Sequence, residues 1–535
     1  MNAKNRNFWG WGYTDYVLPN AVSTQILNHL KMGLGIKNFE QITPPNIKQL
    51  RLPDSKFEIP KSLKNICTAD VAQRAGHSYG KSFRDVWRGL NGIFNHPPDY
   101  VAYPKNENDI QLLFDFAKAK KIALIPYGGG SSVCGGVEPL HLSNYNGCIS
   151  VDMINFDQVL EIDQHSRSAR IQAGIYGLDL ENKLKPYGLT LRHYPQSFEF
   201  STLGGWIATS SGGHFATLYT HIDEFVQAVR MITPNGGILQ SRRLPGSGAG
   251  PSEERLVCGS EGVLGIITEA WMRLQDTPKY KDTVTFFFKE FEQGVEACRI
   301  LAQSGLNPSN ARLVSALEAF SNGLGDGIHT VAIVGFESAY FPVRDLLEKA
   351  ITICTEAGGK ISNKQKENSA TDERAEEWKQ SFIRAPYLRD ELIKNGLVIE
   401  TFETAITWSH FNVLHKKIEQ AVYTSFQRLG MIGFITCRFT HIYPDGPAPY
   451  YTIIAQGKPG AQLEEWDELK QTVSDILIEQ GATITHHHAV GKDHRPWYAK
   501  QASNTFQHIL KSTKSVVDTE WILNPGTLIL KDDIN

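Results

Sequence analysis

Three glycine-rich segments, at residues 126–136, 195–205 and 259–265, are the first candidates for binding chemistry. Glycine permits a positive φ and leaves the backbone N–H groups unshielded by side chains. Successive N–H groups in such a turn form a concave anion site, and serine or threonine hydroxyls add donors for phosphate oxygens. One such turn is more often structural, but three within about 140 residues favour a ligand with an extended, phosphate-bearing body. None has the spacing of a Rossmann turn or a P-loop, so the turns alone do not identify the nucleotide.

A run of three histidines, His486 to His488, is the second candidate, and it has three interpretations. It could be a polar loop with satisfied side chains, a metal site, or a hydrogen-bonding group beside a cofactor. In a strand, alternate side chains face opposite sides, so at most two of the three would converge on one site. Imidazole is a common metal ligand, but no carboxylate or cysteine lies nearby in the sequence to complete a ligand set. We therefore expect no metal.

Tyr450, Arg312 and Arg389 are individually ordinary residues. An isolated strand tyrosine is usually a packing residue, and with a pKa near 10 it is a poor base at neutral pH. It could abstract a proton there only if neighbouring cations or imidazoles lowered that pKa. The planar fork of arginine fits carboxylate and phosphate, although most arginines are solvated surface residues. These side chains need further context before they can be assigned a role.

The composition is that of an ordinary folded protein and argues against several classes. The net charge of -3 gives no electrostatic case for a nucleic-acid partner. The 535 residues suggest two to four domains. No segment approaches 18 uninterrupted apolar residues, and the start of the chain lacks the apolar core of a secretory signal. The 7 cysteines form no CxxC pair, which favours a reducing compartment, and we expect a cytoplasmic protein.

The elements that must position these residues can be read from the hydrophobic pattern. Residues 107–120 carry apolar side chains at helical spacing, and the short apolar run 122–125 predicts a strand that leads straight into the first glycine turn. Further helices are predicted at 23–32, 71–90, 341–356, 464–480 and 505–518. Further strands are predicted at 100–103, 266–268, 284–288 and 330–336, and Tyr450 stands at the start of another.

The glycine segments also carry a family resemblance. Pro-x-Gly-Gly-Gly-Ser-Ser-Val from Pro126, Glu-Phe-Ser-Thr-x-Gly-Gly from Glu199 and Gly-Ser-Glu-Gly-x-Leu-Gly from Gly259 resemble the FAD-contact segments of the vanillyl-alcohol oxidase type of flavoprotein. The resemblance implies FAD held without a covalent bond, its pyrophosphate on the first turn and the later segments along the ribityl chain and ring. The cofactor-binding residues it implies are Pro126, Gly128, Gly129, Gly130, Ser131, Ser132, Gly135, Ser197, Ser201, Thr202, Gly204, Gly205, Glu261, Gly262, Gly265 and Ile267.

This resemblance also implies the fold class. We expect an α+β protein with a two-subdomain FAD-binding domain of the vanillyl-alcohol oxidase type and an α+β cap domain with an antiparallel sheet. The predicted division is a mainly helical N-terminal region at 1–92, the FAD-binding domain at 93–276, the cap at 277–480, and a C-terminal segment at 481–535 that returns to the FAD-binding domain.

Motifs outside the glycine turns narrow the resemblance to the alkyldihydroxyacetonephosphate synthase family. They are Trp-Gly-Trp-Gly-Tyr from Trp9, Arg312-Leu313, Tyr-Leu-Arg-Asp from Tyr387, Glu-Thr-Phe-Glu-Thr from Glu400, Thr-Cys-Arg from Thr436, and Thr-His-His-His-Ala-Val-Gly-Lys from Thr485. That family makes the ether bond of ether lipids, and the resemblance spans nearly the whole chain. It implies exchange of the acyl group of acyl-dihydroxyacetone phosphate for a long-chain alcohol through a covalent flavin–substrate adduct, with no net redox change.

The resemblance assigns roles to the remaining candidates. Tyr450 matches the proton-abstracting tyrosine of the family, and the catalytic set also includes Arg389 on the substrate side and His486, His487 and His488 beside the flavin. Arg312, Arg438 and Lys492 are implied as substrate or wall residues. One departure concerns Ala489, because the family usually has glycine there and a methyl group could tighten or tilt the turn.

Two alternatives remain open at this point. A FAD-linked oxidoreductase of a 2-hydroxyacid, of the D-lactate or glycolate type, typically carries Glu-His-Gly where this chain has His487-His488-Ala489. The other alternative is a lipid- or flavin-binding protein that has lost activity, although Tyr450, Arg389 and all three histidines are retained. The expected partners are lipid substrates and no nucleic acid. Peripheral contact with a membrane and a homodimer are also compatible with the resemblance.

Overall fold

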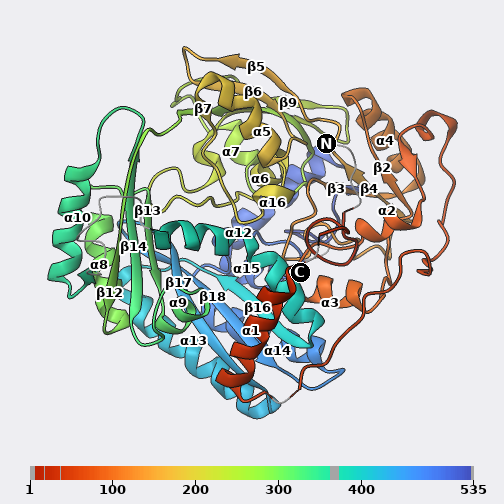
Figure 1. Cartoon of the computed structure of the whole chain (residues 1–535). Helices are drawn as coiled ribbons and strands as arrows, with labels where there is room; N and C mark the ends of the chain where they lie inside the picture. The colour runs from red at the N-terminus through yellow and green to blue at the C-terminus, as the bar shows by residue number, and fades with distance from the viewer. Residues whose placement is uncertain (1–5, 17, 37, 362–372, 532–535) are drawn as a thin grey trace.

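The computed structural model describes residues 6–16, 18–36, 38–361 and 373–531. In this part of the chain the strands form sheets of four, five, two and seven strands. The first two large sheets lie at the right and top of Figure 1, and the seven-stranded sheet lies at the lower left with helices packed around it. The architecture is therefore α+β, as the sequence predicts.

The first sheet positions the first glycine turn. Its strands, in spatial order, are β1 (Cys67–Thr68), β2 (Tyr100–Ala102), β4 (Cys148–Asp152) and β3 (Ala123–Tyr127). β2, β4 and β3 are parallel, and α4 (Glu107–Lys120) connects β2 to β3. α4 buries Ile110, Leu113 and Phe114, and the Asn106 side chain caps its first turn. The buried strand β3 therefore leads directly into the first glycine turn, residues 128–136.

The second sheet is antiparallel and carries the other two glycine segments. Its strands, in spatial order, are β5 (Val159–Asp163), β6 (Ser168–Gln172), β10 (Ile266–Arg273), β8 (Val226–Ile232) and β9 (Ile238–Gln240). Associated elements are α5 (Gly177–Leu184), α6 (Leu203–Ala208), α7 (Glu253–Val257), and the strand pair β7 (Leu189–Thr190) with β11 (Gln275–Asp276). The second glycine segment opens α6, and the third leads into β10.

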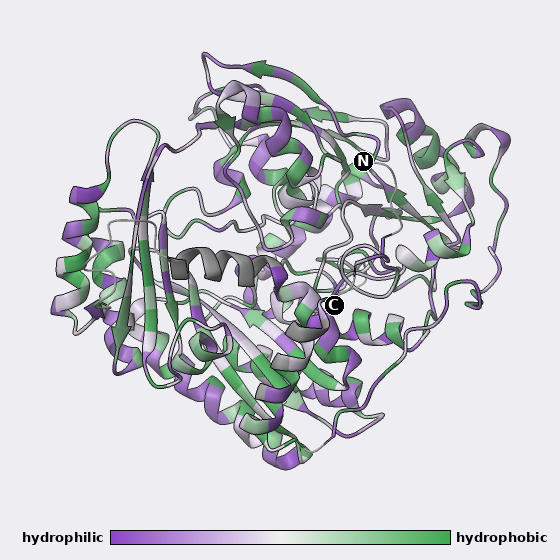
Figure 2. Ribbon diagram, viewed as in Figure 1, coloured by the Kyte–Doolittle hydropathy of each residue, from purple (hydrophilic) through white to green (hydrophobic). Residues whose placement is uncertain are grey.

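The third sheet is antiparallel and has two distinct faces. Its strands, in spatial order, are β15 (Lys360–Ile361), β12 (Tyr280–Phe288), β14 (Thr330–Ser338), β13 (Asn310–Val314), β17 (Ile432–Ile442), β18 (Pro447–Gln456) and β16 (Leu397–Glu403). One face packs on α8 (Phe291–Gln303), α10 (Arg344–Glu356), α13 (Trp408–Leu429) and α14 (Gln462–Glu479). Figure 2 shows apolar residues along these strands and polar ones on the outer turns of the helices. Because side chains alternate along a strand, every second residue of these strands projects to the opposite face of the sheet.

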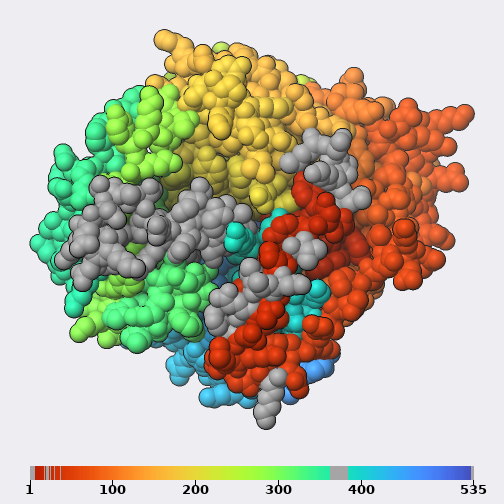
Figure 3. All heavy atoms as spheres, viewed as in Figure 1, coloured from red at the N-terminus to blue at the C-terminus, as the bar shows by residue number. Residues whose placement is uncertain are grey.

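The two ends of the chain join the sheets together. The N-terminal residues, red in Figure 3, lie between the yellow second-sheet region and the cyan residues near the third sheet. At the other end, Leu523 forms a bridge with Leu124 of β3, and Lys514 Nζ donates to the carbonyl of Val263. The remaining helices are α1 (Asn20–Leu34), α2 (Val71–Gly76), α3 (Phe83–Leu90), α9 (Ala316–Ser321), α12 (Glu373–Lys394), α15 (Arg495–Gln501) and α16 (Asn504–Val517), with single 3-10 turns at Lys61–Leu63, Lys185–Tyr187, Phe198–Phe200 and Ile222–Glu224.

Most predicted elements are confirmed, but the single helix at 71–90 is wrong. The chain forms two helices there, α2 and α3, with a break between them. The N–H of Lys81 donates to the carbonyl of Ser132 at 2.6 Å rather than within a helix, and a Cβ at Gly80 would lie 2.2 Å from that oxygen. Ser82 and Asp85 then form a capping box that starts α3.

The predicted boundaries at residues 92, 276 and 480 stay predictions. Among the described residues, we find no helix that combines the length and the apolar character needed to cross a membrane.

Candidate functional site

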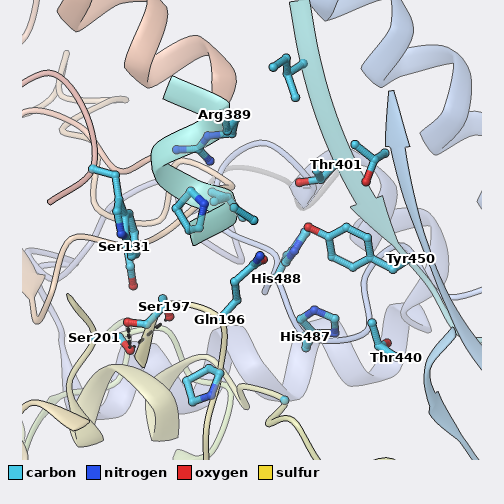
Figure 4. A pocket seen from close by; sticks show the side chains of 18 of the residues that line it. Ser131, Gln196, Ser197, Ser201, Arg389, Thr401, Thr440, Tyr450, His487 and His488 are labelled. Carbon is cyan, nitrogen blue, oxygen red and sulfur yellow. Dashed lines mark hydrogen bonds between the residues drawn. The ribbon is translucent and has the colours of Figure 1, made fainter. Parts of the chain in front are cut away.

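A cavity of about 360 Å³ lies between the glycine turns and the face of the third sheet opposite α8, α10, α13 and α14. Figure 4 shows Ser131, Ser197 and Ser201 on one side of it and Tyr450 and Thr440 on the other, with Gln196, His487 and His488 between them. Trp11 and Arg389 also line it. The walls therefore come from segments that are far apart in the sequence.

The first glycine turn is packed so closely that side chains are excluded. A Cβ at Gly128 would lie 2.4 Å from Thr202 Oγ1, and one at Gly129 would lie 1.8 Å from the carbonyl oxygen of Phe200. Gly130 has φ +69°, a conformation that favours glycine. Residues 128–133 line the cavity, so this bare backbone faces the space that a phosphate-bearing ligand would fill.

The second segment presents hydroxyl groups to the same cavity. Ser201 Oγ accepts from Trp206 Nε1 at 2.6 Å and donates to the carbonyl of Ser197 at 2.8 Å. Thr202 caps α6 by accepting from the N–H of Gly205 at 3.3 Å. The start of α6 therefore faces the cavity beside the first turn, which is a favourable place for an anion. The residues present fit a dinucleotide such as FAD.

The third glycine segment, residues 259–265, packs behind the residues that line the cavity. None of residues 259–267 lines the cavity. A Cβ at Gly262 would lie 2.9 Å from Pro126 Cγ, and one at Gly265 would lie 2.6 Å from Met231 Cγ. Glu261 accepts from the N–H groups of Val490 and Gly491 at 2.9 and 2.7 Å, which ties this segment to the end of the histidine loop. Pro126, Gly135 and Gly204 also lie outside the lining, so cofactor contact by all these residues stays a prediction.

Three polar residues form a row across the third sheet, on the face opposite α8, α10, α13 and α14. In the strand register Glu403 of β16 lies opposite Tyr450 of β18, and Tyr450 lies opposite Arg438 of β17. Directly opposed residues project to the same face. The Arg438 guanidinium lies 3.9 Å from the Tyr450 ring centroid, and its Nη1 contacts Glu318 Oε1 at 2.5 Å. A cation is therefore held against the ring of Tyr450.

Tyr450 does not have the lowered pKa that a base would need at neutral pH. Burial raises the pKa of Tyr450 above its ordinary value, and the nearby Arg438 opposes that rise without reversing it. The closest cation is Arg438, while Arg389 contributes less. At neutral pH the phenol is therefore protonated, and it can act as a base only after passing its proton to a neighbour.

The histidine run lies in a loop between α14 and α15, not in a strand. His487 and His488 line the cavity, and their ring centroids lie 6.0 and 5.5 Å from that of Tyr450. In Figure 4 the Tyr450 hydroxyl points toward His488. His486 turns away, and its Nε2 hydrogen-bonds to the Tyr443 hydroxyl at 2.8 Å. Two of the three imidazoles thus converge on Tyr450.

These imidazoles are neutral at neutral pH. Burial lowers the pKa of His488 to about 3 and also lowers the pKa of His487, in both cases against the opposing effect of Glu403. Burial and the neighbouring imidazole of His221 hold the pKa of His486 well below its ordinary value. Each neutral imidazole has a free ring nitrogen that can accept a hydrogen bond or a proton beside Tyr450, although the lowered pKa makes it a weaker base than an exposed histidine.

The fold supplies a carboxylate that the sequence around the histidines lacks, because Glu403 of β16 contacts His487 and His488. Glu403, His487 and His488 form one group whose atoms lie close enough to hold a metal, and His441, His486 and His487 form another. The Glu403 oxygens already accept from backbone N–H groups of the loop, and His486 Nδ1 hydrogen-bonds to His487 Nδ1 at 3.1 Å.

The predicted cations have different surroundings. Arg389, on α12, lines the cavity, and its Nη2 contacts Asp390 Oδ1 at 3.0 Å. Arg312 of β13 also lines the cavity, and its Nη2 donates to the carbonyl of His214 at 2.8 Å. Lys492 is buried outside the lining, where its Nζ donates to Thr527 Oγ1 at 2.7 Å. Lys492 therefore binds the C-terminal segment rather than facing the cavity.

Sequence reasoning assigned no role to several residues of the site. Glu403 and Glu318 are buried carboxylates, and Trp11 and His441 line the cavity. A charged residue within an apolar strand was the available signal for Glu403, because such a group needs buried partners. Glu318 had no comparable signal, since its partner Arg438 is 120 positions away.

Comparisons with known proteins agree with this geometry. Residues 98–242 match the family model of the FAD binding domain, and residues 277–528 match that of FAD linked oxidases, C-terminal domain. The alkyldihydroxyacetonephosphate synthase of Dictyostelium discoideum is 30% identical over 523 residues, 94% of this chain and 84% of the relative. That of Trypanosoma brucei brucei is 26% identical over 516 residues, 92% of this chain and 82% of the relative.

A solved alkyldihydroxyacetonephosphate synthase structure superposes with a TM-score of 0.82 at 25% identity, covering 97% of this chain and 98% of the other. These matches cover nearly the whole chain. The chain belongs to the alkyldihydroxyacetonephosphate synthase family of FAD-dependent enzymes.

Proposed function

We propose that this enzyme exchanges the acyl group of acyl-dihydroxyacetone phosphate for a long-chain alcohol. The substrate C1 loses a proton, its bond to the carboxylate oxygen breaks, and the fatty acid departs. The alcohol oxygen then forms the new bond to C1 and gives up its hydroxyl proton to the departed carboxylate. The proton taken from C1 is returned, so no electrons are gained or lost overall. The products are the ether-linked dihydroxyacetone phosphate and a free fatty acid.

The mixed lining of the cavity is the observation that carries this proposal. In the strand register Arg438 and Tyr450 share one cross-strand row of the third sheet, and Phe434, Ile454 and Ile399 share another row four residues along each strand. All five residues line the cavity. A substrate with a phosphate-bearing part and a long hydrocarbon chain matches both rows, whereas a small 2-hydroxyacid would leave the apolar row uncovered.

When bound, FAD would supply an electrophilic ring that holds the carbon skeleton between departure of the acid and addition of the alcohol. Residues 128–133 and Ser201 would hold the cofactor on one side of the cavity. Tyr450, His487 and His488 face that side from the other wall. We propose that these three side chains move the proton: the Tyr450 phenol passes its proton to a neighbouring imidazole as its oxygen takes the proton from the substrate C1, and both transfers reverse when the proton is returned.

We further propose that Arg389 binds the substrate phosphate. Its guanidinium lines the cavity, and the adjacent Asp390 holds its orientation through Nε and Nη2. A planar guanidinium fixed in this way can offer the parallel donors that phosphate accepts. Arg438 is committed to Glu318 and to the Tyr450 ring, and we propose that it sets the proton affinity of that tyrosine.

The function is tested by supplying the purified flavin-loaded protein with acyl-dihydroxyacetone phosphate and a long-chain alcohol. We expect ether-linked product and free fatty acid in equal amounts. A Tyr450→Phe variant should lose exchange by about 100-fold while keeping its flavin spectrum. Bleaching of the flavin by D-lactate or glycolate, without ether product, would support the hydroxyacid oxidoreductase instead.

Peripheral membrane contact is the second part of the proposal. α9 (Ala316–Ser321) ends at the cavity, where Ser321 lines the wall. The same helix exposes Leu317 and Phe320, and Ile328 in the loop that follows is 73% exposed. Apolar side chains beside a cavity mouth would let fatty substrates enter directly from a bilayer.

Co-sedimentation with phosphatidylcholine vesicles tests this surface. Replacing Leu317, Phe320 and Ile328 together by serine should reduce vesicle binding several-fold. The matched control replaces Phe506, Ile509 and Val516, three exposed apolar residues of α16, and should leave binding unchanged. Loss of binding in the control alone would move the docking surface to α16. A homodimer and a cytoplasmic location stay predictions from the sequence.

A further inference from the structure

Glu403 is a buried carboxylate whose position connects the catalytic strand row to the histidine loop. It is the last residue of β16, it lies opposite Tyr450 in the strand register, and its side chain is fully buried. Glu400, three residues earlier in the strand, projects to the other face, where it accepts from Trp466 Nε1 and Lys470 Nζ of α14. The two glutamates of one strand therefore serve different sides of the sheet.

The carboxylate of Glu403 is surrounded by donors from one short loop. Its Oε1 accepts from Thr485 Oγ1 at 2.7 Å, from the N–H of His487 at 3.1 Å and from the N–H of His488 at 2.7 Å. Its Oε2 accepts from the N–H of His486. Three consecutive backbone N–H groups thus point at a single buried anion, which is how a nest of amides binds a negative charge.

This arrangement decides where the imidazoles lie. A loop whose successive N–H groups converge on one carboxylate cannot change its backbone angles without breaking several charge-assisted hydrogen bonds at once. The Nδ1 atoms of His487 and His488 lie 3.8 and 3.6 Å from the same carboxylate, and both rings line the cavity. Burial lowers the pKa of both imidazoles, and Glu403 opposes that change.

We propose that Glu403 is a positioning residue, whose carboxylate shapes the loop from Thr485 to His488 so that His487 and His488 face Tyr450. It touches neither substrate nor cofactor space, because it lies beneath the loop and outside the cavity lining. The inference rests on the proposed exchange reaction for its catalytic consequence, while the structural part stands on the hydrogen bonds alone.

The test compares Glu403→Gln with Glu403→Asp in the flavin-loaded enzyme. Glutamine keeps the shape of the side chain but replaces one carboxylate oxygen by an amide NH₂ group. Because that group would face the backbone N–H donors of the loop, the loop must shift. We expect kcat to fall about 100-fold, since misplacement by about 1 Å costs that much, with KM changed less than threefold. Aspartate retains the charge with shorter reach, and its kcat should stay within about tenfold of the wild type.

A matched control separates this effect from general loss of stability. Asp99 is also a buried carboxylate that accepts two backbone N–H groups, from Lys56 and Cys148, and it lies away from the site. Asp99→Asn should lower the melting temperature while leaving kcat per flavin unchanged. If Glu403→Gln keeps kcat within threefold, or loses only what Asp99→Asn loses, Glu403 has no positioning role.

A second measurement does not depend on the reaction. Diethyl pyrocarbonate modifies neutral imidazoles, and peptide mass spectrometry reports the rate at each histidine. The side chains of His487 and His488 are only 17% and 12% exposed, so a loosened loop in Glu403→Gln should raise their modification rates about tenfold. Rates that stay unchanged overturn the proposal. Raised rates in an enzyme that performs no exchange would instead reject the proposed function and keep the positioning role.

If Glu403→Gln does not fold, Thr485→Val provides the same information. It removes one donor to Glu403 at nearly constant volume and leaves the charge in place. We expect a smaller rise in modification at His487 and His488 and a smaller loss of kcat, each about threefold. Wild-type values for both would contradict the proposal.

Discussion

Gly129 shows how much a single residue can determine in this site. The carbonyl oxygen of Phe200 occupies the space that its side chain would need, at 1.8 Å from an ideal Cβ. The first and second glycine segments are therefore pressed together at this point. We therefore propose that the anion site formed by these two segments is already in place before any ligand arrives.

We predict that Gly129→Ala abolishes flavin binding. The added methyl must push residues 200–202 away from the first turn, which separates the two groups of donors. Flavin absorbance per protein at constant folded content measures this loss. Gly246→Ala is the matched control, because nothing lies within 4 Å of its Cβ position, and it should bind flavin normally. Full flavin occupancy in Gly129→Ala would show that residues 200–202 can shift to accommodate the methyl group without loss of the binding site.

Ala489 provides a second prediction at the residue scale. It has φ +72°, in the left-handed region where a Cβ costs roughly 1–2 kcal/mol. Glycine relieves that strain but costs roughly 0.4–1 kcal/mol by loosening the unfolded chain. We expect Ala489→Gly to raise stability slightly, by about 0.5 kcal/mol, and to preserve exchange activity. Thermal melting checks the first part, and a clear loss of stability would mean that the methyl group makes a compensating contact.

At the scale of elements, Asp390 connects the N-terminal segment to α12. Its Oδ2 accepts from the N–H of Trp11, and its Oδ1 accepts from the guanidinium of Arg389. On the other side, Arg6 Nη1 donates to the carbonyl of Gly129 at 3.3 Å. The N-terminal residues therefore link the arginine-bearing helix to the first glycine turn, and Asp390 holds both Trp11 and Arg389.

We predict that Asp390→Asn weakens substrate binding more than it slows the chemistry. The loss of a charge-assisted contact is worth about 1.5–3 kcal/mol, so KM for acyl-dihydroxyacetone phosphate should rise at least tenfold with kcat within threefold. Steady-state kinetics measure both. Glu391→Gln, at the next position, changes a carboxylate that accepts from Ser23 Oγ and should leave KM unchanged. An equal fall in kcat for Asp390→Asn would place Arg389 in the chemical step instead.

Local signals in the sequence predicted the elements well, and they failed where a contact depends on the sheet register. The helix at 107–120 and the glycine turns were predictable because their patterns are contained within a few residues. Glu400 and Glu403 look alike in the sequence, yet one meets α14 and the other holds the histidine loop. Their difference arises from strand parity and from a loop more than 80 positions away, which no local pattern contains.

At the scale of the whole molecule, several buried histidines make stability depend on pH. Burial lowers the pKa of His193, His488 and His494 to about 3. Each is neutral in the fold but takes up a proton in the unfolded chain below its ordinary pKa of about 6.5. These histidines do not reduce stability above about pH 7, where both states are neutral. The free energy of unfolding falls as the pH drops from 6.5 toward 3.

We therefore predict that melting temperature falls by several degrees between pH 7.5 and 5.5. Each histidine costs up to about 1.4 kcal/mol at the lower value. A His193→Gln variant lies outside the catalytic row and should show a smaller fall than the wild type. Calorimetry in two buffers at pH 5.5 should also detect proton uptake on unfolding. A melting temperature that is constant over this range would contradict the neutral state of these side chains.

The return of the C-terminal segment to the first sheet has a consequence for how the enzyme is made. Leu523 pairs with Leu124, and Asn524 donates to the carbonyls of Gly136 and Glu261. During synthesis the first glycine turn leaves the ribosome long before these partners do. Although domains generally fold as units while the chain grows, these contacts can form only after residues 523 and 524 have left the ribosome. We therefore expect the wall around Gly136 to be completed only when a segment 388 positions further along the chain has been made.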